Sequence, residues 1–175
     1  MDWNDLINKT AQAARNAFDD LKKNRAGENF YAYALYTDSS AMTIVSAANS
    51  LEALENIVAS DGDRSPESIS YYKWSTSEWA YEAWKREEFR GISTALRESS
   101  DRDSDFAGFK RTVFNSMIEA MRKLSEDGFF GTEEERNSVT IFITSTDDDE
   151  SQNIENESAK ILNSEPVFKL FLSRS

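Results

Sequence analysis

The sequence predicts a single α+β domain over residues 1–175, with a mostly antiparallel sheet of about four strands and helices packed on it. Three observations predict this class. Residues 30–37 alternate as a strand with no charged side chain on either face, so both of its faces need cover. A short turn joins this strand to a second strand candidate, which indicates an antiparallel hairpin. Two long amphipathic stretches, residues 2–26 and 105–126, supply helices that can cover the sheet.

The predicted elements of the first half follow one another with short connections. A helix over residues 2–26 carries apolar side chains at three- and four-residue steps, which places them on one face. The strand at 29–38 and a second strand at 41–48 are linked by a turn of small polar residues. A helix over 49–60 follows, with Asn49 as the first residue of a capping-box pattern.

The strand at 29–38 sorts its side chains onto two faces. Because successive side chains of a strand point to opposite sides, Tyr31 and Tyr33 fall on the same face. We expect the segment 74–81, which is rich in aromatic residues, to cover that face. If it lies elsewhere, both tyrosines are exposed and mark a binding surface.

The second half is predicted from the same kinds of pattern. Residues 68–74 are predicted as a third strand, and residues 75–99 as a helix that Ser75 and Glu78 cap reciprocally. The strong amphipathic helix at 105–126 comes next. The remaining predicted elements are a helical turn at 132–136, a β-branched strand at 138–145, a helix at 151–163 and a short helix at 167–172.

The composition excludes several classes of chemistry. The 175 residues include no Cys and no His, so disulfides, thiolate metal sites and catalytic triads that need either residue are impossible within the chain. Lys and Arg total 20 against 32 for Asp and Glu, which gives a net charge of -12. This charge disfavours binding to nucleic acid and to anionic membranes and favours binding to a basic partner. The alternative is that the charge only keeps the protein soluble. We find no secretory leader and no apolar run of about 20 residues, so we expect a cytoplasmic protein.

Three segments carry a resemblance to a known family. They are the strand Tyr31-Ala32-Tyr33-Ala34-Leu35-Tyr36-Thr37-Asp38, the motif Trp74-Ser75-Thr76-Ser77-Glu78-Trp79-Ala80-Tyr81-Glu82 and the strand Val139-Thr140-Ile141-Phe142-Ile143. With these segments the chain resembles a full-length member of an uncharacterised bacterial family, domain of unknown function 4303, and the second segment is the most specific. The resemblance implies no catalytic residues. Some proteins of this kind are found beside secreted bacterial toxins, so the resemblance implies an immunity role.

Two groups of residues are candidate partner-binding sites. Aromatic side chains of residues 71–84 could form an interface, since Trp and Tyr dominate interface hot spots, or they could fill the core. Within this group Glu78 is interpreted as a helix cap in preference to a catalytic acid. Asp38 is either a polar anchor in a pocket or an ordinary turn residue. The full candidate set is Tyr31, Tyr33, Asp38, Trp74, Glu78, Trp79, Tyr81, Asp147, Asp148, Asp149 and Glu150.

The acidic run at 147–150 is the second group. Calcium needs oxygen ligands at defined spacings, with a turn glycine and a distant bidentate Glu. Neither this run nor the segment 61–63 has that frame, so we expect solvated acidic loops and no metal or cofactor. The run is instead a candidate surface for a basic protein partner.

The leading hypothesis is a non-enzymatic protein-binding module, an immunity protein that occludes a basic toxin domain. In this hypothesis the acidic run steers the partner and the aromatic side chains hold it. The alternative is a small-molecule-binding domain with a pocket between the central strand and the Trp74–Tyr81 segment. A third, weaker hypothesis is a hydrolase that uses carboxylates and a metal. A concave, partly apolar pocket favours the ligand, whereas a flat or convex acidic face favours the protein partner.

Overall fold

The computed structural model describes residues 1–146 and 148–174 and confirms the predicted α+β class. Its four-stranded sheet has the order β3-β2-β1-β4. The strands are β1 (Phe30–Asp38), β2 (Val45–Ser50), β3 (Tyr81–Glu82) and β4 (Thr140–Thr146). β1 pairs antiparallel with β2 and parallel with β4, and β2 pairs antiparallel with β3, so the sheet is mixed but mostly antiparallel.

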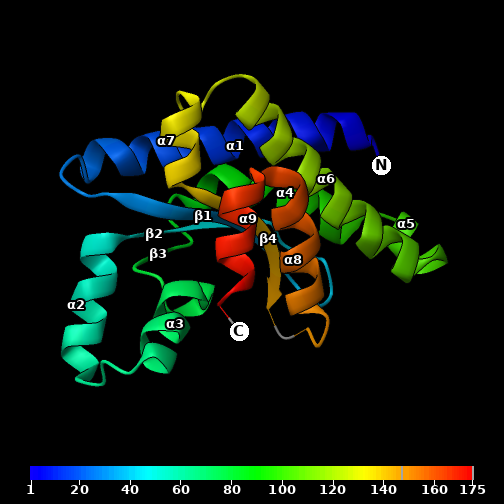
Figure 1. Ribbon diagram of the computed structural model, residues 1–175. Helices are drawn as coiled ribbons and strands as arrows, with labels where there is room; N and C mark the ends of the chain where they lie inside the picture. Colours follow the sequence, from blue (N-terminus) through cyan, green and yellow to red (C-terminus); the bar gives the residue numbers. More distant parts are fainter. Residues whose placement is uncertain (147, 175) are drawn as a thin grey trace.

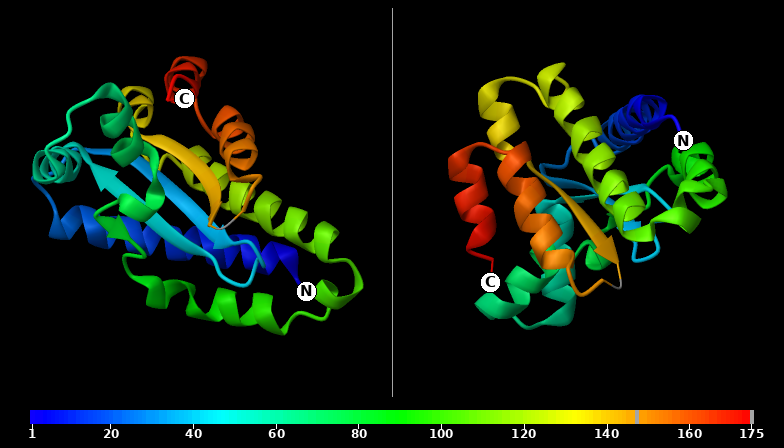
Figure 2. Two further views of the ribbon diagram at one scale, coloured as in Figure 1. Left: turned by 90° about the horizontal axis from the view of Figure 1, so that it is seen from below. Right: turned by 90° about the vertical axis from the view of Figure 1, so that its right-hand side faces the viewer.

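Helices cover both faces of the sheet, as Figures 1 and 2 show. The helices are α1 (Trp3–Asn24), α2 (Leu51–Asp61), α3 (Pro66–Trp74), η1 (Thr76–Glu78), η2 (Arg86–Phe89), α4 (Arg90–Glu98), α5 (Asp101–Ser104), α6 (Phe106–Glu126), α7 (Glu133–Ser138), α8 (Ser151–Leu162) and α9 (Glu165–Leu172). The helices α1, α4 and α6 lie on one face, and α2, α3 and α9 on the other (Figure 2, left). Within the described residues, none of these helices combines the length and the apolar character needed to cross a bilayer.

A bulge in β1 overturns the expected grouping of its tyrosines. The pairing with β2 shifts between Phe30 and Ala32, so the side chains on either side of the bulge do not keep a strict alternation. Tyr33 packs in the apolar cluster under α1 and α6, whereas Tyr31 packs in the cluster under α2, α3 and α9. The two tyrosines therefore lie on opposite faces, and both are buried, at 7% exposed for Tyr31 and 1% for Tyr33.

The outer edge of β4 is closed by side chains of α8 rather than by another strand. The Ile143 amide donates to Ser158 Oγ at 2.9 Å, and the same hydroxyl donates to the Ile143 carbonyl at 3.2 Å. The Asn163 amide group does the same for Ile141, accepting at 2.9 Å and donating at 2.6 Å. These two polar side chains imitate a strand partner, so the backbone groups of Ile141 and Ile143 are not free to pair with another chain.

The prediction of a strand at 68–74 is wrong, because this segment is the helix α3. Ser65 caps it by accepting a hydrogen bond from the Ser68 amide, and Pro66 occupies the first turn, where its fixed φ suits a helix. The strand that does pair with β2 is the two-residue β3. The local start signals at 65–66 outweigh the β propensity of the tyrosines that follow.

The prediction of one helix over 75–99 is also wrong. The carboxylate of Glu78 does not complete a capping box; it accepts a hydrogen bond from the Tyr71 hydroxyl at 3.0 Å instead. The chain passes through η1 and β3 and then takes positive φ at Ala83 (54°) and Lys85 (55°), which a continuous helix cannot contain. Helix α4 begins only at Arg90.

The boundaries of the first hairpin differ from prediction as well. The segment before β2 takes a positive φ of 50° at Ala41, so the second strand starts at Val45 and not at residue 41. Asn49 lies inside β2, and the cap of α2 is the next residue, Ser50, whose hydroxyl accepts from the Ala53 amide. The other predicted helices and β4 lie within a few residues of their expected positions.

Candidate functional site

An open cleft of about 780 Å³ lies at the carboxyl end of β4. One wall is formed by α3 and η1, and the other by the end of β4, the first turns of α8 and the residues that follow α9. Its volume lies in the range of about 300–1,000 Å³ that is usual for ligand pockets. The lining is rich in hydroxyl groups, including those of Ser70, Thr144, Ser145, Ser151 and Ser173.

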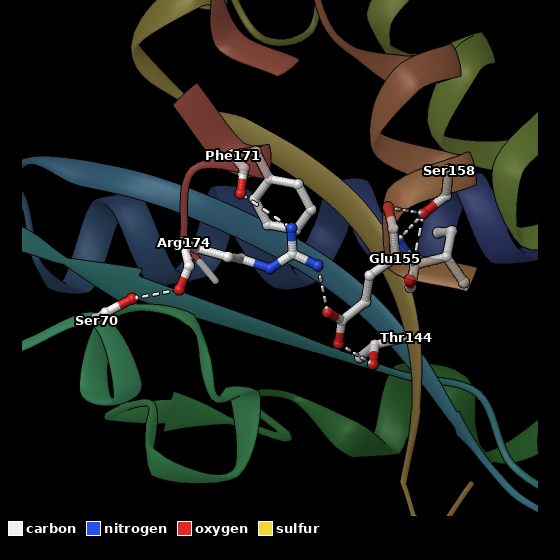
Figure 3. Close-up of polar contacts among 7 residues, drawn as sticks. Ser70, Thr144, Glu155, Ser158, Phe171 and Arg174 are labelled. Carbon is white, nitrogen blue, oxygen red and sulfur yellow. Dashed lines mark hydrogen bonds and ion pairs between the residues drawn. The ribbon is translucent and has the colours of Figure 1, made fainter. Parts of the chain in front are cut away.

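A buried ion pair forms the floor of this cleft (Figure 3). The Arg174 guanidinium donates through Nη2 to Glu155 Oε2 at 2.9 Å, and the side chains are only 7% and 18% exposed. Glu155 Oε1 accepts a second hydrogen bond from the Thr144 hydroxyl at 2.7 Å. The pair therefore has strong additional hydrogen bonds, which a buried ion pair needs to offset its desolvation.

Helix geometry brings these groups together. Phe171 is in the last turn of α9 and Arg174 is in the turn that follows it, where the Arg174 amide donates to the Phe171 carbonyl at 3.3 Å; the Arg174 guanidinium lies 3.7 Å from the centre of the Phe171 ring. Arg174 Nη1 also donates to the Phe171 carbonyl at 2.9 Å, which adds a charged donor to a carbonyl at the helix end. The Ser70 hydroxyl donates to the Arg174 carbonyl at 2.8 Å and so ties α3 to the end of the chain (Figure 3).

Trp74 is the predicted site residue that lines this cleft, and Glu78 bonds to Tyr71, another residue of the lining. The Trp74 ring lines it, half-buried, with its edge contacts on Phe171 at 5.0 Å and Tyr31 at 6.0 Å between ring centres. Glu78 lies beside it, held by the hydroxyl of Tyr71, whose side chain is 52% exposed. This corner of the cleft therefore presents an aromatic ring and a carboxylate to solvent.

The other aromatic candidates belong to the core, which corrects their assignment to a binding surface. Trp79 is 3% exposed, and its indole Nε1 donates to the Lys73 carbonyl at 3.1 Å. Tyr31 donates to the same carbonyl at 2.8 Å and contacts the rings of Trp74 and Trp79, so the Trp74–Tyr81 segment covers the face that carries Tyr31 but not the face that carries Tyr33. Tyr33 donates to the Ala14 carbonyl on the opposite face.

Tyr81 and Asp38 also have structural partners. The Tyr81 hydroxyl, 6% exposed as a residue, contacts both carboxylate oxygens of Glu28 at 2.7 and 2.6 Å. Burial, with the Glu28 carboxylate adding to it, raises the pKa of Tyr81 to about 12. Asp38 accepts hydrogen bonds from the Ser40 and Met42 amides. It therefore acts as an ordinary turn residue, the second of its two interpretations from the sequence.

The acidic run is divided in the structure. Asp147 lies outside the described residues. Asp148 forms an ion pair with Lys110 of α6 at 2.5 Å, and its side chain is 8% exposed. Burial alone would raise the pKa of Asp148, but hydrogen bonds from Lys110 and from the Glu150 amide outweigh it and leave that pKa below its ordinary value. Asp149 and Glu150 are exposed, just before the first turn of α8, and line a second hollow between α6 and α8.

Sequence reasoning missed Glu155 and Arg174. A lone Glu in an amphipathic helix and a lone Arg near the end of a chain are ordinary surface residues by pattern, so only the fold shows that they meet. The same holds for the hydroxyl groups of the lining. Among the residues that the structure describes, no three acidic side chains gather closely enough to hold a metal ion.

Removing one member of the ion pair is expected to destabilise the protein more than replacing both. Glu155→Gln leaves the Arg174 charge buried without a counter-charge and should lower the free energy of unfolding by about 2–3 kcal/mol. Adding Arg174→Met should recover part of this loss, because a methionine packs on Phe171 without charge. Urea denaturation of the two single variants and the double variant gives the coupling energy. A coupling below about 0.5 kcal/mol would mean that the pair behaves as an exposed one.

The comparisons with known proteins give one match. The family model described as "Domain of unknown function (DUF4303)" matches residues 11–164, which includes the sheet, η1 and α8. Neither the curated proteins nor the solved structures compared with the chain give a significant match. Arg174, one half of the ion pair in the cleft, lies after the matched region. Because the family model covers most of the 175 residues, the chain belongs to the DUF4303 family.

Proposed function

We propose that this protein is a non-enzymatic binding protein that occludes a basic protein partner, as an immunity protein blocks a toxin in the cytoplasm of its own cell. One observation carries the proposal. The candidate segment 74–77 forms part of one wall of the open cleft, and the opposite wall begins at Ser151, directly after the acidic residues 148–150, which line the neighbouring hollow between α6 and α8. The exposed side chains of Glu67 and Tyr71 line this cleft, which a protruding part of a partner can enter.

The charges around the cleft support a basic partner. Glu67 and Glu78 lie on the α3 and η1 side, and Asp149 and Glu150 lie just before α8 on the other. Arg174, the basic residue in the cleft lining, is neutralised by Glu155. With a net charge of -12 over the chain, this arrangement raises the association rate of a basic partner and disfavours an acidic one.

The state of the carboxylates supports a binding role over a catalytic one. Glu155, the acidic residue on the floor of the cleft, is held by Arg174 and Thr144, and such a carboxylate is a poor general base because its lone pairs are engaged. The chain has no His or Cys to supply another base or nucleophile. A binding protein needs neither.

The proposal predicts that a toxin is encoded beside this protein, and co-production with that toxin tests it. A susceptible bacterium that makes the toxin should survive only when it also makes this protein, and the purified pair should associate. Because the attraction is electrostatic, the affinity should fall by about tenfold or more between low and physiological salt. The double variant Glu67→Lys with Glu78→Lys should weaken binding, whereas Glu98→Lys on α4, on the other face of the sheet, should not. Cells that die equally with and without this protein would contradict the proposal.

The volume and lining of the cleft favour a second candidate function, the binding of a small polar molecule. The volume of the cleft is in the usual range for small-molecule pockets, and the hydroxyl groups of its walls can donate and accept hydrogen bonds. It adjoins Trp74 as the sequence predicted, but it faces the end of β4 rather than the central strand β1. A ligand that quenches Trp74 fluorescence in the wild type and not in Trp74→Phe would favour this candidate, because the partner hypothesis requires no such ligand.

A further inference from the structure

The groove between α6 and α8 has the dimensions of a helix-binding site. On α6 the side chains of Phe106, Lys110, Phe114 and Ile118 are four residues apart and so line one stripe, about 18 Å long at 1.5 Å per residue. Ile154 of α8 lies on the opposite wall, and the two helices contact each other. The groove has a volume of about 810 Å³ and is open to solvent.

The floor of this groove is apolar and in part exposed. Phe106 is 43% exposed, and Ile118 and Ile154 are half-buried against the main core. Phe114, 9% exposed, completes the stripe between them. The stripe is apolar except at Lys110, whose charge Asp148 neutralises, and a partly exposed apolar stripe on helices that are otherwise charged is typical of a surface that another chain covers.

The charges on the two walls are unequal. Lys110 of α6 is neutralised by Asp148, and Arg111 on the same wall has no ion-pair partner among the residues that the structure describes. The α8 wall carries Asp149, Glu150 and Glu157, all exposed. A helix that lies in the groove therefore meets carboxylates along one flank and needs basic side chains there.

A strand is a poorer occupant than a helix at this place. The nearby sheet edge is β4, and its backbone groups at Ile141 and Ile143 already bond to Asn163 and Ser158. Strand addition needs a free edge, whereas a helix needs only an apolar groove with anchors at three- and four-residue steps. A third helix laid on two packed helices also meets the usual interaxial spacing of 8–10 Å.

We propose that this groove binds an amphipathic α-helix with a basic flank, contributed by the protein partner. The apolar face of that helix contacts Phe106, Ile118 and Ile154, and its basic flank contacts Glu157 and Asp149. The identification of the occupant as part of the partner rests on the proposed function. The recognition of a basic amphipathic helix rests only on the groove and its charges.

A synthetic peptide of about 18 residues made of Leu and Lys, with the leucines on one helical face, tests the binding itself. Amide chemical-shift changes in the ¹⁵N-labelled protein should cluster on α6 and the start of α8. Asn115→Arg puts bulk and positive charge at an exposed position of the groove and should weaken the peptide by about tenfold or more, and Glu157→Lys should also weaken it. The matched controls are Glu98→Lys and a peptide with Glu in place of Lys.

Three outcomes overturn the groove proposal: equal binding of the Glu peptide, unchanged affinity of both groove variants, or shift changes that cluster at the cleft beside Trp74. The exposed positions of Asn115 and Glu157 allow both variants to fold, which circular dichroism verifies. The survival assay separates this proposal from the proposed function. If the wild type and Asn115→Arg protect cells equally, the partner does not use the groove, and the immunity role is retained. If Asn115→Arg loses both peptide binding and protection, the result supports the groove proposal and the immunity role together.

Discussion

Raising the pH from about 9 to about 12 is expected to unfold this protein cooperatively, because buried tyrosines must stay protonated in the fold. Burial raises the pKa of Tyr31 and of Tyr33 well above the ordinary value near 10, and raises that of Tyr36 and Tyr81 as well. Tyr33 is 1% exposed, stacks on Phe18 with ring centres 4.4 Å apart and donates to the Ala14 carbonyl. A phenolate at this position would be without hydrating water, and its charged oxygen would lie against the Ala14 carbonyl oxygen, which is itself a hydrogen-bond acceptor.

The sign of the effect follows from the unfolded chain. Its tyrosines ionise near pH 10, whereas those in the fold stay neutral, so the unfolded state binds fewer protons above pH 10. The stability contributed by the neutral phenols is complete below about pH 10 and is lost as the pH rises. Tyr31 and Tyr33 together account for roughly 3 kcal/mol per pH unit, which within two units approaches the whole stability of an ordinary domain.

Absorbance at 295 nm and far-ultraviolet circular dichroism should therefore change together during an alkaline titration. Tyr33→Phe isolates the contribution of one phenol from that of the lysines, which lose their charge in the same range. This variant should be about 1–3 kcal/mol less stable at neutral pH, because the Ala14 carbonyl loses its donor, and the difference should shrink above pH 10. Tyr71→Phe, at a half-exposed position, should alter the profile much less. Tyrosine ionisation well before loss of helix signal would contradict the account.

Periodicity in the sequence predicted the parts of this fold that depend on a single apolar face. The helix α6 and the strand β4 are found close to their predicted positions, because regular burial leaves a regular pattern. The segment 66–89 was predicted wrongly for the opposite reason. Its aromatic residues pack on several neighbours at once, with Trp79 on Tyr31 and Phe142 and Tyr81 on Phe30 and Trp84, so they follow no period.

The candidate site was predictable only in part. Trp74 and Glu78 stood out because a local motif contains them; Trp74 lines the cleft, and Glu78 bonds to Tyr71 of its lining. The bulge that separates Tyr31 from Tyr33 arises from a one-residue shift against β2, and nothing local in 29–38 announces it. The groove and the floor of the cleft are made by contacts between α6, α8 and α9, which are long-range and carry no local signal.

Phe142→Ala is expected to lower the free energy of unfolding by about 3–5 kcal/mol, the usual effect of deleting a fully buried aromatic ring. The Phe142 side chain is 0% exposed at the middle of β4. Its ring contacts Phe171 at 4.9 Å and Trp79 at 5.7 Å between centres. The Phe142 ring thus supports both walls of the cleft. On one side it contacts Phe171, which packs against Arg174 and Trp74. On the other side it contacts Trp79, whose indole donates to the Lys73 carbonyl at the end of α3.

Two consequences of this truncation can be separated by experiment. Urea denaturation measures the loss of stability, and Phe106→Ala, which removes a ring that is 43% exposed, is the matched control with an expected loss below about 1 kcal/mol. In the folded fraction, Phe142→Ala should also loosen the packing around Trp74 and shift its fluorescence to the red. The reason is that Phe171 and Trp79, which Phe142 holds in place, lose their common contact. A variant that is as stable as Phe106→Ala would mean that α9 and η1 hold the cleft without the ring between them. Unchanged Trp74 emission in a strongly destabilised variant would instead place the support of the cleft in the Arg174–Glu155 pair and the Ser70 contact rather than in the apolar layer beneath them.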